Sequence, residues 1–352
     1  MTVITSPGPQ LDAFGAQHGV EVHALTMPRR VTPKEDAISL TRLTLLLRRL
    51  RPSLVHAHTP KGGLLGTIAA TLAGVPARLY HMRGLPFATA MGAQRALLAA
   101  TERTSTSLAT RVLAVSASLR DAAVRAHLCE ASKIQVLGCG SGNGVDCDGR
   151  FNPANVAVDA RQAFREKLRL PPSSAVVGFL GRLVRDKGIV ELAAAWAELR
   201  VRFPDAHLVL GGSFEDRDAV SPETKALLME DPRVHMLGFV QDAPGFYAGI
   251  DVLALPTYRE GFPNVLLEAA AMRVPVVATR VTGCVDAVLD GVTGTLVAAG
   301  SGRALADALA LYLANPELRA RHGARARMRV ERDFRSERIW EALANVYDEL
   351  AA

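Results

Sequence analysis

Two short segments hold the residues whose types and spacing could do chemistry. In residues 178–188 (GFLGRLVRDKG), an apolar run ends at Gly181, and Arg182 and Lys187 follow before a helical stretch begins. A strand, a glycine turn and a helix N-terminus direct backbone N–H groups and the helix dipole toward an anion. The two cations would add charge-assisted contacts that suit a diphosphate. The alternative is that Arg182 and Lys187 are solvated surface residues, and this segment alone does not distinguish the two interpretations.

The second segment, residues 258–268 (YREGFPNVLLE), contains two carboxylates, Glu260 in a loop and Glu268 in the helix that follows. Gly261 lets a ligand approach the backbone, and Pro263 suits the first helical turn. Each carboxylate can accept hydrogen bonds from a pair of vicinal hydroxyls on a sugar or a ribose. Backbone N–H groups near the turn are free to face a sugar or a phosphate, namely those of Phe262, Asn264 and Val265.

Glu268 stands on an almost wholly apolar helix, where a carboxylate needs a partner or a ligand. An exposed helix residue is the simplest alternative. The acid and base of a glycoside hydrolase are another, but one loop and helix would then have to place both carboxylates across a single bond.

Together these segments resemble the retaining glycosyltransferases of family 4, including those of bacterial capsule, O-antigen and exopolysaccharide synthesis, which have the GT-B fold. Seven residues separate Glu260 from Glu268, as in the family's E-x7-E motif, and residues 181–188 match its phosphate-binding loop. Residues 275–279, Gly283 and residues 290–294 match later segments. The resemblance covers residues 171–350 closely, and the N-terminal half more loosely through residues 55–58, 112–116 and 143–146.

The resemblance implies a role for each matched residue. Arg182 and Lys187, after Gly181, would bind the donor diphosphate, and Glu268 would hold the ribose. Glu260 and the backbone of residues 261–265 would hold the transferred sugar. The acceptor would attack on the face that the leaving group departs from, and the leaving phosphate would help remove its proton. No metal and no other cofactor are expected, because the two cations replace a metal.

Strand-like and helical stretches alternate along the chain, which predicts βαβ units and parallel sheets. We expect an α/β protein with two Rossmann-like domains, residues 1–155 on the acceptor side and 156–334 on the donor side, facing a central cleft. A helix over residues 335–352 would pack back toward the N-terminal domain. Ligands in such sheets lie beyond the carboxyl ends of the strands.

The N-terminal half departs from the family pattern in two ways. Relatives begin with a strand, a glycine-rich loop and a helix that this chain lacks, so we expect the N-terminal sheet to lack its first strand and the recorded start to be internal. Relatives carry His-Gly where this chain has Arg83-Gly84, with His81 two residues earlier. Arg83 is therefore a candidate catalytic residue, together with Glu260. Candidates on the acceptor or phosphate side are His81, Lys61 and Gly62.

Charge is unevenly distributed: residues 1–170 hold 21 Lys and Arg against 11 Asp and Glu, and the rest hold 20 against 24. A basic half suggests an anionic partner, and aromatic residues, only 5% of the chain, make nucleic acid the weakest candidate. A polyprenyl-diphosphate-linked or glycan acceptor and an anionic inner membrane fit better. Four cysteines without metal-type spacing, no signal peptide and no long apolar run favour a cytoplasmic protein, peripheral to the membrane at most.

Three functions stay open from the sequence. The favoured one is a transferase that uses a UDP- or GDP-sugar in polysaccharide synthesis. A nucleotide-sugar epimerase with the same fold is the second, although the spacing of Glu260 and Glu268 is not its signature. An inactive, truncated nucleotide-sugar binder is the third.

Overall fold

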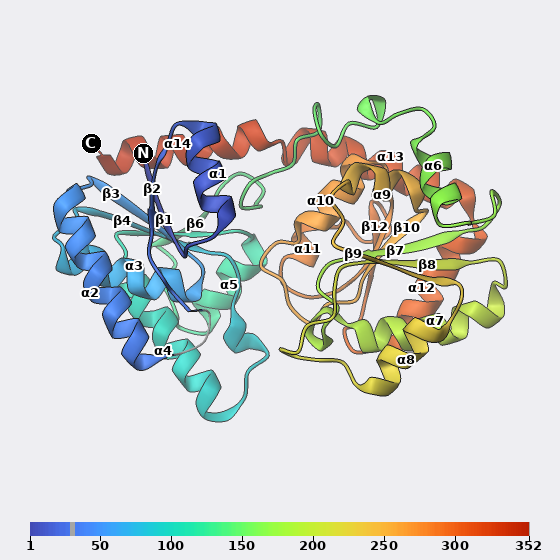
Figure 1. Cartoon of the computed structure of the whole chain (residues 1–352), viewed down its shortest axis with the longest axis horizontal. Coiled ribbons are helices and arrows are strands. Elements are labelled where there is room, and N and C mark those ends of the chain that lie inside the picture. Colours follow the sequence, from blue (N-terminus) through green and yellow to red (C-terminus); the bar gives the residue numbers. More distant parts are fainter. Residues whose placement is uncertain (29–31, 352) are drawn as a thin grey trace. The chain divides into compact units, whose positions relative to one another are not determined.

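The computed structural model describes residues 1–28 and 32–351, and these form two compact units (Figure 1). Unit 1 contains Met1–Ala114, Arg120–Val136 and the end of the last helix from Leu343, while unit 2 contains Val115–Leu119 and Leu137–Ala342. Every ladder between named strands in both units is parallel. No helix in these residues combines the length and the apolar character needed to cross a membrane.

Unit 1 has two separate parallel sheets, where the sequence predicted one parallel sheet that lacks its first strand. β1 (Thr2–Thr5) pairs with β2 (Glu21–Ala24), and the second sheet has the order β3-β4-β5-β6. The strands of the second sheet are β3 (Leu54–His58), β4 (Ala77–Met82), β5 (Arg111–Ala114) and β6 (Ile134–Val136). The helices are α1 (Pro9–His18), α2 (Pro33–Leu50), α3 (Pro60–Leu72), η1 (Pro86–Ala88), α4 (Gly92–Leu108) and α5 (Ala117–Arg125). Among the described residues, no strand joins β1 to β3.

An apolar cluster links the two sheets of unit 1 through α2 and α3. Leu43 and Leu47 of α2 pack with Ala69 of α3 and with Leu25, which follows β2, while Val55 of β3 lies against the same cluster. Each fully buried leucine contributes about 1.5–3 kcal/mol. The cluster therefore holds β1 and β2 to the unit without backbone pairing to β3.

A buried carboxyl group in unit 1 gives a testable pH dependence. Glu102 of α4 is 2% exposed, accepts a hydrogen bond from the Tyr80 hydroxyl (2.8 Å), and burial raises its pKa to about 7. The pKa of Glu102 is higher in the folded protein than its usual 4.5, so folding favours the protonated carboxyl group. The free energy of unfolding is therefore unaffected by this group below about pH 4.5, and it falls as pH rises until the group ionises in the folded protein near pH 7. The total loss of free energy of unfolding corresponds to about 3 kcal/mol.

We therefore expect Glu102→Gln to flatten the fall in stability between pH 5 and pH 8.5. Urea unfolding followed by circular dichroism at both pH values measures this fall. Glu130→Gln, at an exposed glutamate of the same unit, is the control and should behave like the unmodified chain. Equal pH dependence in Glu102→Gln and the unmodified chain would contradict the assignment.

Unit 2 contains one six-stranded sheet of order β12-β11-β10-β7-β8-β9. Its strands are β7 (Val176–Leu180), β8 (His207–Gly211), β9 (Val234–Gly238), β10 (Val252–Leu255), β11 (Val276–Thr279) and β12 (Gly294–Val297). From β7 the chain adds β8 and β9 on one side and then returns to place β10 on the other. The boundary between β7 and β10 is therefore the switch point at which ligands bind in open α/β sheets.

Helices cover both faces of this sheet (Figure 1). α7 packs against α12 on one face, and α10 packs against α13 on the other. The helices of the unit are η2 (Pro153–Asn155), α6 (Ala160–Lys167), η3 (Arg185–Lys187), α7 (Ile189–Arg202), α8 (Pro222–Glu230), α9 (Ala243–Gly249), α10 (Asn264–Ala271), α11 (Cys284–Ala287), α12 (Gly302–Ala314), α13 (Pro316–Asp333) and α14 (Ser336–Ala351), whose last turns belong to unit 1. Three of these elements, α9, α11 and β12, were not predicted from the sequence.

Unit 2 takes in the chain from Leu137, whereas the expected boundary was at residue 155. The guanidinium of Arg327 in α13 explains the difference, because it donates to the carbonyls of Cys147 and Phe151 (both 2.8 Å) and of Ala271 (2.7 Å). Arg327 is buried, so these bonds fix residues 147–151 firmly against α10 and α13.

Candidate active site

The predicted donor residues come from two neighbouring strands of unit 2. β7 and β10 are adjacent in the sheet, and each is followed by a loop and a helix. α7 begins at Ile189 and α10 begins at Asn264, so both helices start beyond the carboxyl ends of their strands. Two helix N-termini with unsatisfied N–H groups therefore face the same edge of the sheet, which favours a bound anion.

Lys187 and Glu260 form an ion pair between these two loops. Their side chains are 19% and 13% exposed, so both groups are largely withdrawn from water but reachable. The structure thus brings together a cation predicted for the diphosphate and a carboxylate predicted for the sugar, although 72 residues lie between them in the chain.

The two loops are also joined through Asp186. Its carbonyl accepts hydrogen bonds from the Tyr258 N–H (2.9 Å) and the Thr257 hydroxyl (3.1 Å), and its carboxylate pairs with Arg259 at 2.8 Å. Gly188, with φ +74°, makes the close approach possible, since a Cβ there would lie 2.0 Å from the carbonyl oxygen of Pro256. These contacts hold the relative position of Lys187 and Glu260.

Neighbouring residues position the backbone of the second loop. The carbonyl of Gly261 accepts from the Ser116 hydroxyl (2.8 Å), and that of Glu260 accepts from the Thr282 hydroxyl (2.9 Å). Gly283 has φ +75°, and a Cβ there would lie 2.4 Å from the Gly261 oxygen. These positioning roles were not predictable from local spacing, although Gly283 and Ser116 lie in segments that match the family.

Glu268 has the buried partner that its apolar helix required. The Tyr247 hydroxyl donates to Oε2 of Glu268 at 2.9 Å, and Tyr247 is fully buried. Burial raises the pKa of Glu268, while the Tyr247 hydrogen bond and the charge of Arg150 oppose the rise. Tyr247 lies in α9, which the sequence analysis missed, so its role was not predicted.

The other donor candidates occupy the same edge with different surroundings. Arg182 is exposed and pairs with Glu215 at 3.1 Å, and Gly181 has φ +154° at the end of β7. Pro263 caps α10 at its start, so Asn264 and Val265 form the first turn as expected. The Phe262 ring is 5.4 Å from that of Phe334, so its side chain serves packing while its backbone lines the loop.

The acceptor candidates lie in unit 1 at the carboxyl ends of β3 and β4. Arg83 donates from Nε to Nδ1 of His58 (3.2 Å), and His81 is buried. Lys61 pairs with Asp36 at 2.5 Å, and the Gly62 N–H donates to the Thr59 hydroxyl. Lys61 and Gly62 at the start of α3 thus have protein contacts that a phosphate would have to replace.

Three histidines gather beside Arg83, namely His56, His58 and His81. Burial, then neighbouring positive charge, lowers their pKa values to about 2, 4 and 3 respectively, so all three rings are neutral at physiological pH. Of the three, only His81 was a site candidate from the sequence.

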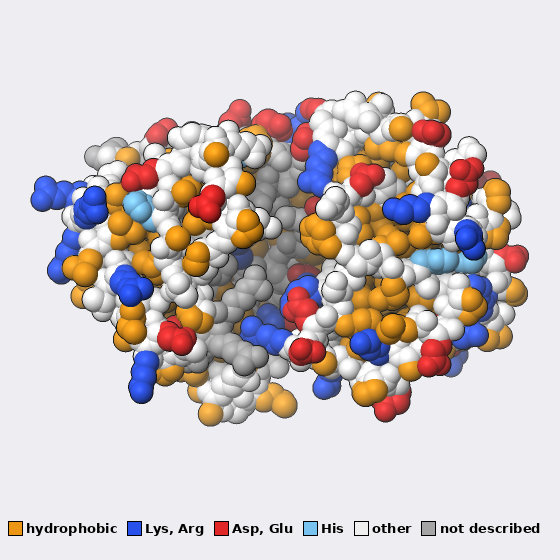
Figure 2. Space-filling model, in the orientation of Figure 1, with side chains coloured by type: hydrophobic (Ala, Val, Ile, Leu, Met, Phe, Trp, Pro, Cys, Tyr) orange, Lys and Arg blue, Asp and Glu red, His pale blue; other side chains and the backbone are white. Residues whose placement is uncertain are grey.

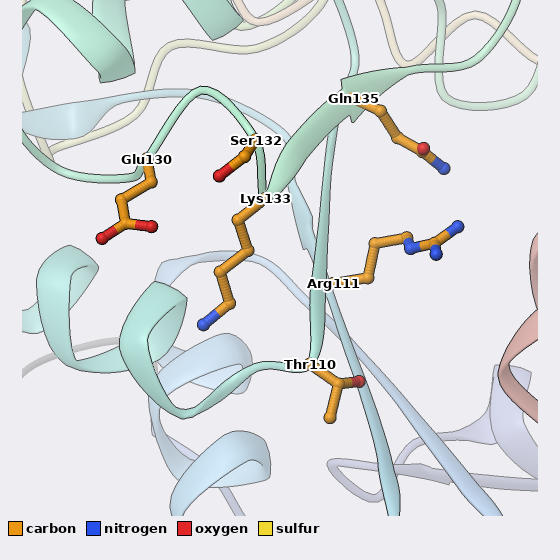
Figure 3. Close-up of a pocket in the computed structure, with 6 residues that line it drawn as sticks. All are labelled: Thr110, Arg111, Glu130, Ser132, Lys133 and Gln135. Atoms are coloured by element: carbon orange, nitrogen blue, oxygen red, sulfur yellow. The ribbon is translucent and has the colours of Figure 1, made fainter.

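A polar pocket of about 420 Å³ lies in unit 1 at the amino ends of β5 and β6, the strand ends opposite to those that hold the histidines (Figure 3). Its lining residues are Thr110, Arg111, Glu130, Ser132, Lys133 and Gln135. Arg111 pairs with Glu349 of α14, and the Lys133 ammonium donates to the Ser107 carbonyl at 2.8 Å. Both cations are thus neutralised or satisfied within the protein, and none of the predicted site residues lies here.

Comparison with known proteins decides the family. Residues 160–329 match the family described as Glycosyl transferases group 1, and residues 1–140 match the Glycosyl transferase 4-like domain. The capsular polysaccharide biosynthesis glycosyltransferase CapM of Staphylococcus aureus is 34% identical over 346 residues, covering 98% of this chain and 89% of that protein. The chain belongs to this glycosyltransferase family. The protein is therefore a glycosyltransferase, as the motif at Glu260 and Glu268 predicted.

Two further likenesses extend the comparison. The UDP-Gal:alpha-D-GlcNAc-diphosphoundecaprenol alpha-1,3-galactosyltransferase of Escherichia coli is 28% identical over 261 residues, covering 73% of this chain and 65% of that protein. The crystal structure of Anabaena Alr3699/HepE in complex with UDP-glucose has a TM-score of 0.81, with 22% identity and 99% of both chains covered. At that identity the likeness establishes the fold, and it confirms the α/β GT-B fold of this glycosyltransferase.

Proposed function

We propose that this glycosyltransferase transfers a sugar, with retention of configuration, from a UDP- or GDP-sugar that binds at the β7–β10 edge of unit 2. The observation that carries the proposal is the contact between Lys187 and Glu260 at this switch point, between the N-termini of α7 and α10. When the donor binds, Lys187 and Arg182 contact the diphosphate, and Glu260 accepts from the sugar hydroxyls. Glu268 holds the ribose, with Tyr247 fixing its carboxylate.

The charges at this edge support a diphosphate without a bound metal. Two helix N-termini together provide roughly one elementary charge, and Lys187 and Arg182 add two formal charges. The leaving diphosphate gains negative charge as the sugar departs, so these groups stabilise the transition state more than the ground state. The ion pair with Glu260 keeps Lys187 in place before the donor arrives.

In the proposed transfer, the acceptor hydroxyl attacks the anomeric carbon on the face from which the diphosphate leaves. The bond from the anomeric carbon to the phosphate oxygen breaks as the bond to the acceptor oxygen forms. The acceptor proton passes to an oxygen of the leaving diphosphate, so no protein base is required. Arg83 and Glu260 act as positioning charges at the acceptor and the sugar.

A donor-profile assay tests this function directly. The protein is incubated with UDP- and GDP-sugars, with and without bacterial lipid extract, and released nucleotide is measured. We expect one nucleotide class to be consumed, with a rate that rises when lipid extract supplies an acceptor. NMR of the product should show the anomeric configuration of the donor. Inversion, or nucleotide binding without turnover under every condition, would overturn the proposal.

We further propose that the acceptor is a glycan carried on a polyprenyl diphosphate and that unit 1 rests on the cytoplasmic face of an anionic membrane. α2 exposes Arg42, Arg48 and Arg49 together with Ile38 (52% exposed) and Leu45 (59%). Figure 2 shows Lys and Arg side chains along the α2 side of unit 1, interspersed with apolar ones. A helix of this kind binds at the interface of an anionic bilayer. Lys61 and Gly62 remain candidates for contact with the acceptor, whereas His81 is buried and does not reach the surface.

Flotation with liposomes tests the membrane contact. We expect the protein to float with vesicles that contain anionic lipid at low salt, and to stay in solution with neutral vesicles. Each surface cation contributes about 1 kcal/mol, so Arg42→Gln with Arg49→Gln should reduce the bound fraction about tenfold or more. The matched control replaces the exposed Arg303 and Arg321 of unit 2, which should leave flotation unchanged. Equal flotation of both double variants would contradict the assignment to α2.

A further inference from the structure

Three imidazole rings of unit 1 converge at the carboxyl ends of β3 and β4. His56 and His58 are two residues apart on β3, so their side chains leave the same face of the sheet. His81 on β4 is the register partner of His58. One ring nitrogen from each histidine lies within 4.8 Å of the other two. The sheet therefore gathers three ligand atoms of one chemical type at one point.

Two of these rings have buried nitrogens for which the described residues offer no hydrogen-bond partner. These atoms are Nε2 of His56 and Nδ1 of His81, and His81 is only 1% exposed. A buried polar atom without a hydrogen-bond partner destabilises the folded protein. A ligand that binds both nitrogens would remove this cost, and neutral imidazole is the form that binds a metal.

A neighbouring side chain can fix the tautomer of His56, as residues around a metal site do for its histidine ligands. The Tyr347 hydroxyl lies 2.6 Å from Nδ1 of His56. When Nδ1–H donates to that oxygen, the lone pair is on Nε2, the buried atom without a partner. Metal-ligating histidines commonly have their second nitrogen held by such a hydrogen bond.

From this geometry we propose that His56, His58 and His81 bind one divalent transition-metal ion of the Zn²⁺ class. Imidazole ligands favour Zn²⁺, Co²⁺, Ni²⁺ and Cu²⁺ over the hard ion Mg²⁺. Bonds of about 2.0–2.1 Å in a tetrahedral site place the ligand atoms about 3.4 Å apart. Rotation of the side chains closes the remaining distance, and a fourth position stays open to water. All three ligands belong to unit 1, so the site does not rest on the proposed donor chemistry.

Arg83 is the competitor of the metal in this site. Its Nε donates to Nδ1 of His58, so it uses the lone pair of that ring and adds a positive charge beside the ion. Metal binding requires His58 to release this hydrogen bond or to change its tautomer. Removal of the Arg83 charge should therefore strengthen metal binding, whereas loss of a ligand should weaken it.

The test measures metal binding to the full chain, free of purification tags and stripped with chelator. Cys139 is replaced by Ser in every sample because its thiol is exposed and binds soft ions itself. Equilibrium dialysis with Zn²⁺ gives stoichiometry and affinity, and the visible spectrum of the Co²⁺ form reports tetrahedral coordination. We expect one ion per chain, with Mg²⁺ unable to displace it.

Variants then locate the ion. We expect His56→Gln and His58→Gln, which each remove a ligand, to weaken Zn²⁺ binding by at least the roughly 10- to 100-fold that loss of a residue supporting a ligand costs, and Arg83→Gln to strengthen it. His207→Gln is the matched control, because His207 and His235 form a histidine pair (3.1 Å) in unit 2. It should bind Zn²⁺ like the parent.

His81→Gln changes a buried residue, so circular dichroism must first show that this variant folds. If it does not fold, the Zn²⁺ affinities of Arg83→Gln and His56→Gln test the proposal instead. Failure of the parent to bind one ion, equal affinity of His56→Gln and the parent, or weaker binding by Arg83→Gln would each overturn the proposal. A loss of binding in His207→Gln would likewise place the ion elsewhere.

Discussion

Lys187→Ala is expected to lower kcat/KM for sugar transfer by about 10²–10³-fold, the effect of removing one group that stabilises charge developing in a transition state. Lys187 is only 19% exposed and lies between two helix N-termini, so in the proposed transfer its charge would act on the leaving diphosphate with little screening by water. Lys187→Arg, which keeps the charge with a different shape, should recover part of the activity. Steady-state kinetics with the nucleotide sugar chosen by the donor profile measure both effects.

A second variant separates the direct role of Lys187 from its contact with Glu260. Glu260→Gln removes the ion pair but keeps the cation, so affinity for the nucleotide without its sugar should change little. Lys187→Ala should weaken that affinity clearly. Lys225→Ala is the control, because Lys225 is an exposed lysine of the same unit that packs over the Phe214 ring. Equal losses of nucleotide affinity in Glu260→Gln and Lys187→Ala would mean that Lys187 acts only by holding Glu260.

The features of this site that could be predicted are those that depend on residues close together in the sequence. The βα alternation, the turn at Gly181 and the interval between Glu260 and Glu268 indicated two loops at the carboxyl ends of strands. Their meeting depends on the strand order, in which β10 lies beside β7. Local periodicity does not contain that order, because it arises from how crossover connections pack over the whole sheet.

Tyr247 shows why supporting residues were missed. Its helix α9 has seven residues and contains Pro244 and two glycines, so it is too short and too irregular for a helical period to emerge. One local signal was present: the Asp242 carboxylate caps this helix by accepting from the Gly245 N–H at 3.0 Å. An aspartate followed by proline in the first turn is a recognisable helix start. The contact between Tyr247 and Glu268 nonetheless depends on how α9 packs against α10, which local sequence does not specify.

The arrangement of strands in unit 1 differs more from the prediction, because side-chain packing as well as backbone pairing determines it. The alternation of strands and helices predicted one sheet, but the apolar cluster built on Leu43 and Leu47 holds β1 and β2 through helices instead. The histidine cluster arises in the same way, since the register of His58 with His81 joins residues that are 23 positions apart.

Glu268→Gln is expected to weaken binding of the nucleotide sugar about 10- to 100-fold, which corresponds to loss of hydrogen bonds to a charged group worth about 1.5–3 kcal/mol. The amide oxygen still accepts from Tyr247, so folding should be retained. A nucleotide sugar is the appropriate ligand, because its diphosphate is a diester without a proton that titrates near neutrality. Isothermal titration calorimetry from pH 5 to pH 8 measures the affinity.

Tyr247→Phe gives this prediction its sharpest form. Burial raises the pKa of Glu268 and the Tyr247 hydrogen bond lowers it, so loss of the hydroxyl should raise it further. If Glu268 holds the ribose as proposed, binding needs its carboxylate, so affinity should fall as pH drops through this pKa. In Tyr247→Phe the fall should begin at higher pH. Tyr312→Phe is the control, because the buried Tyr312 bonds Thr295 and His322 instead. If Tyr247→Phe and the parent show the same pH profile, Glu268 does not hold the ribose as a carboxylate.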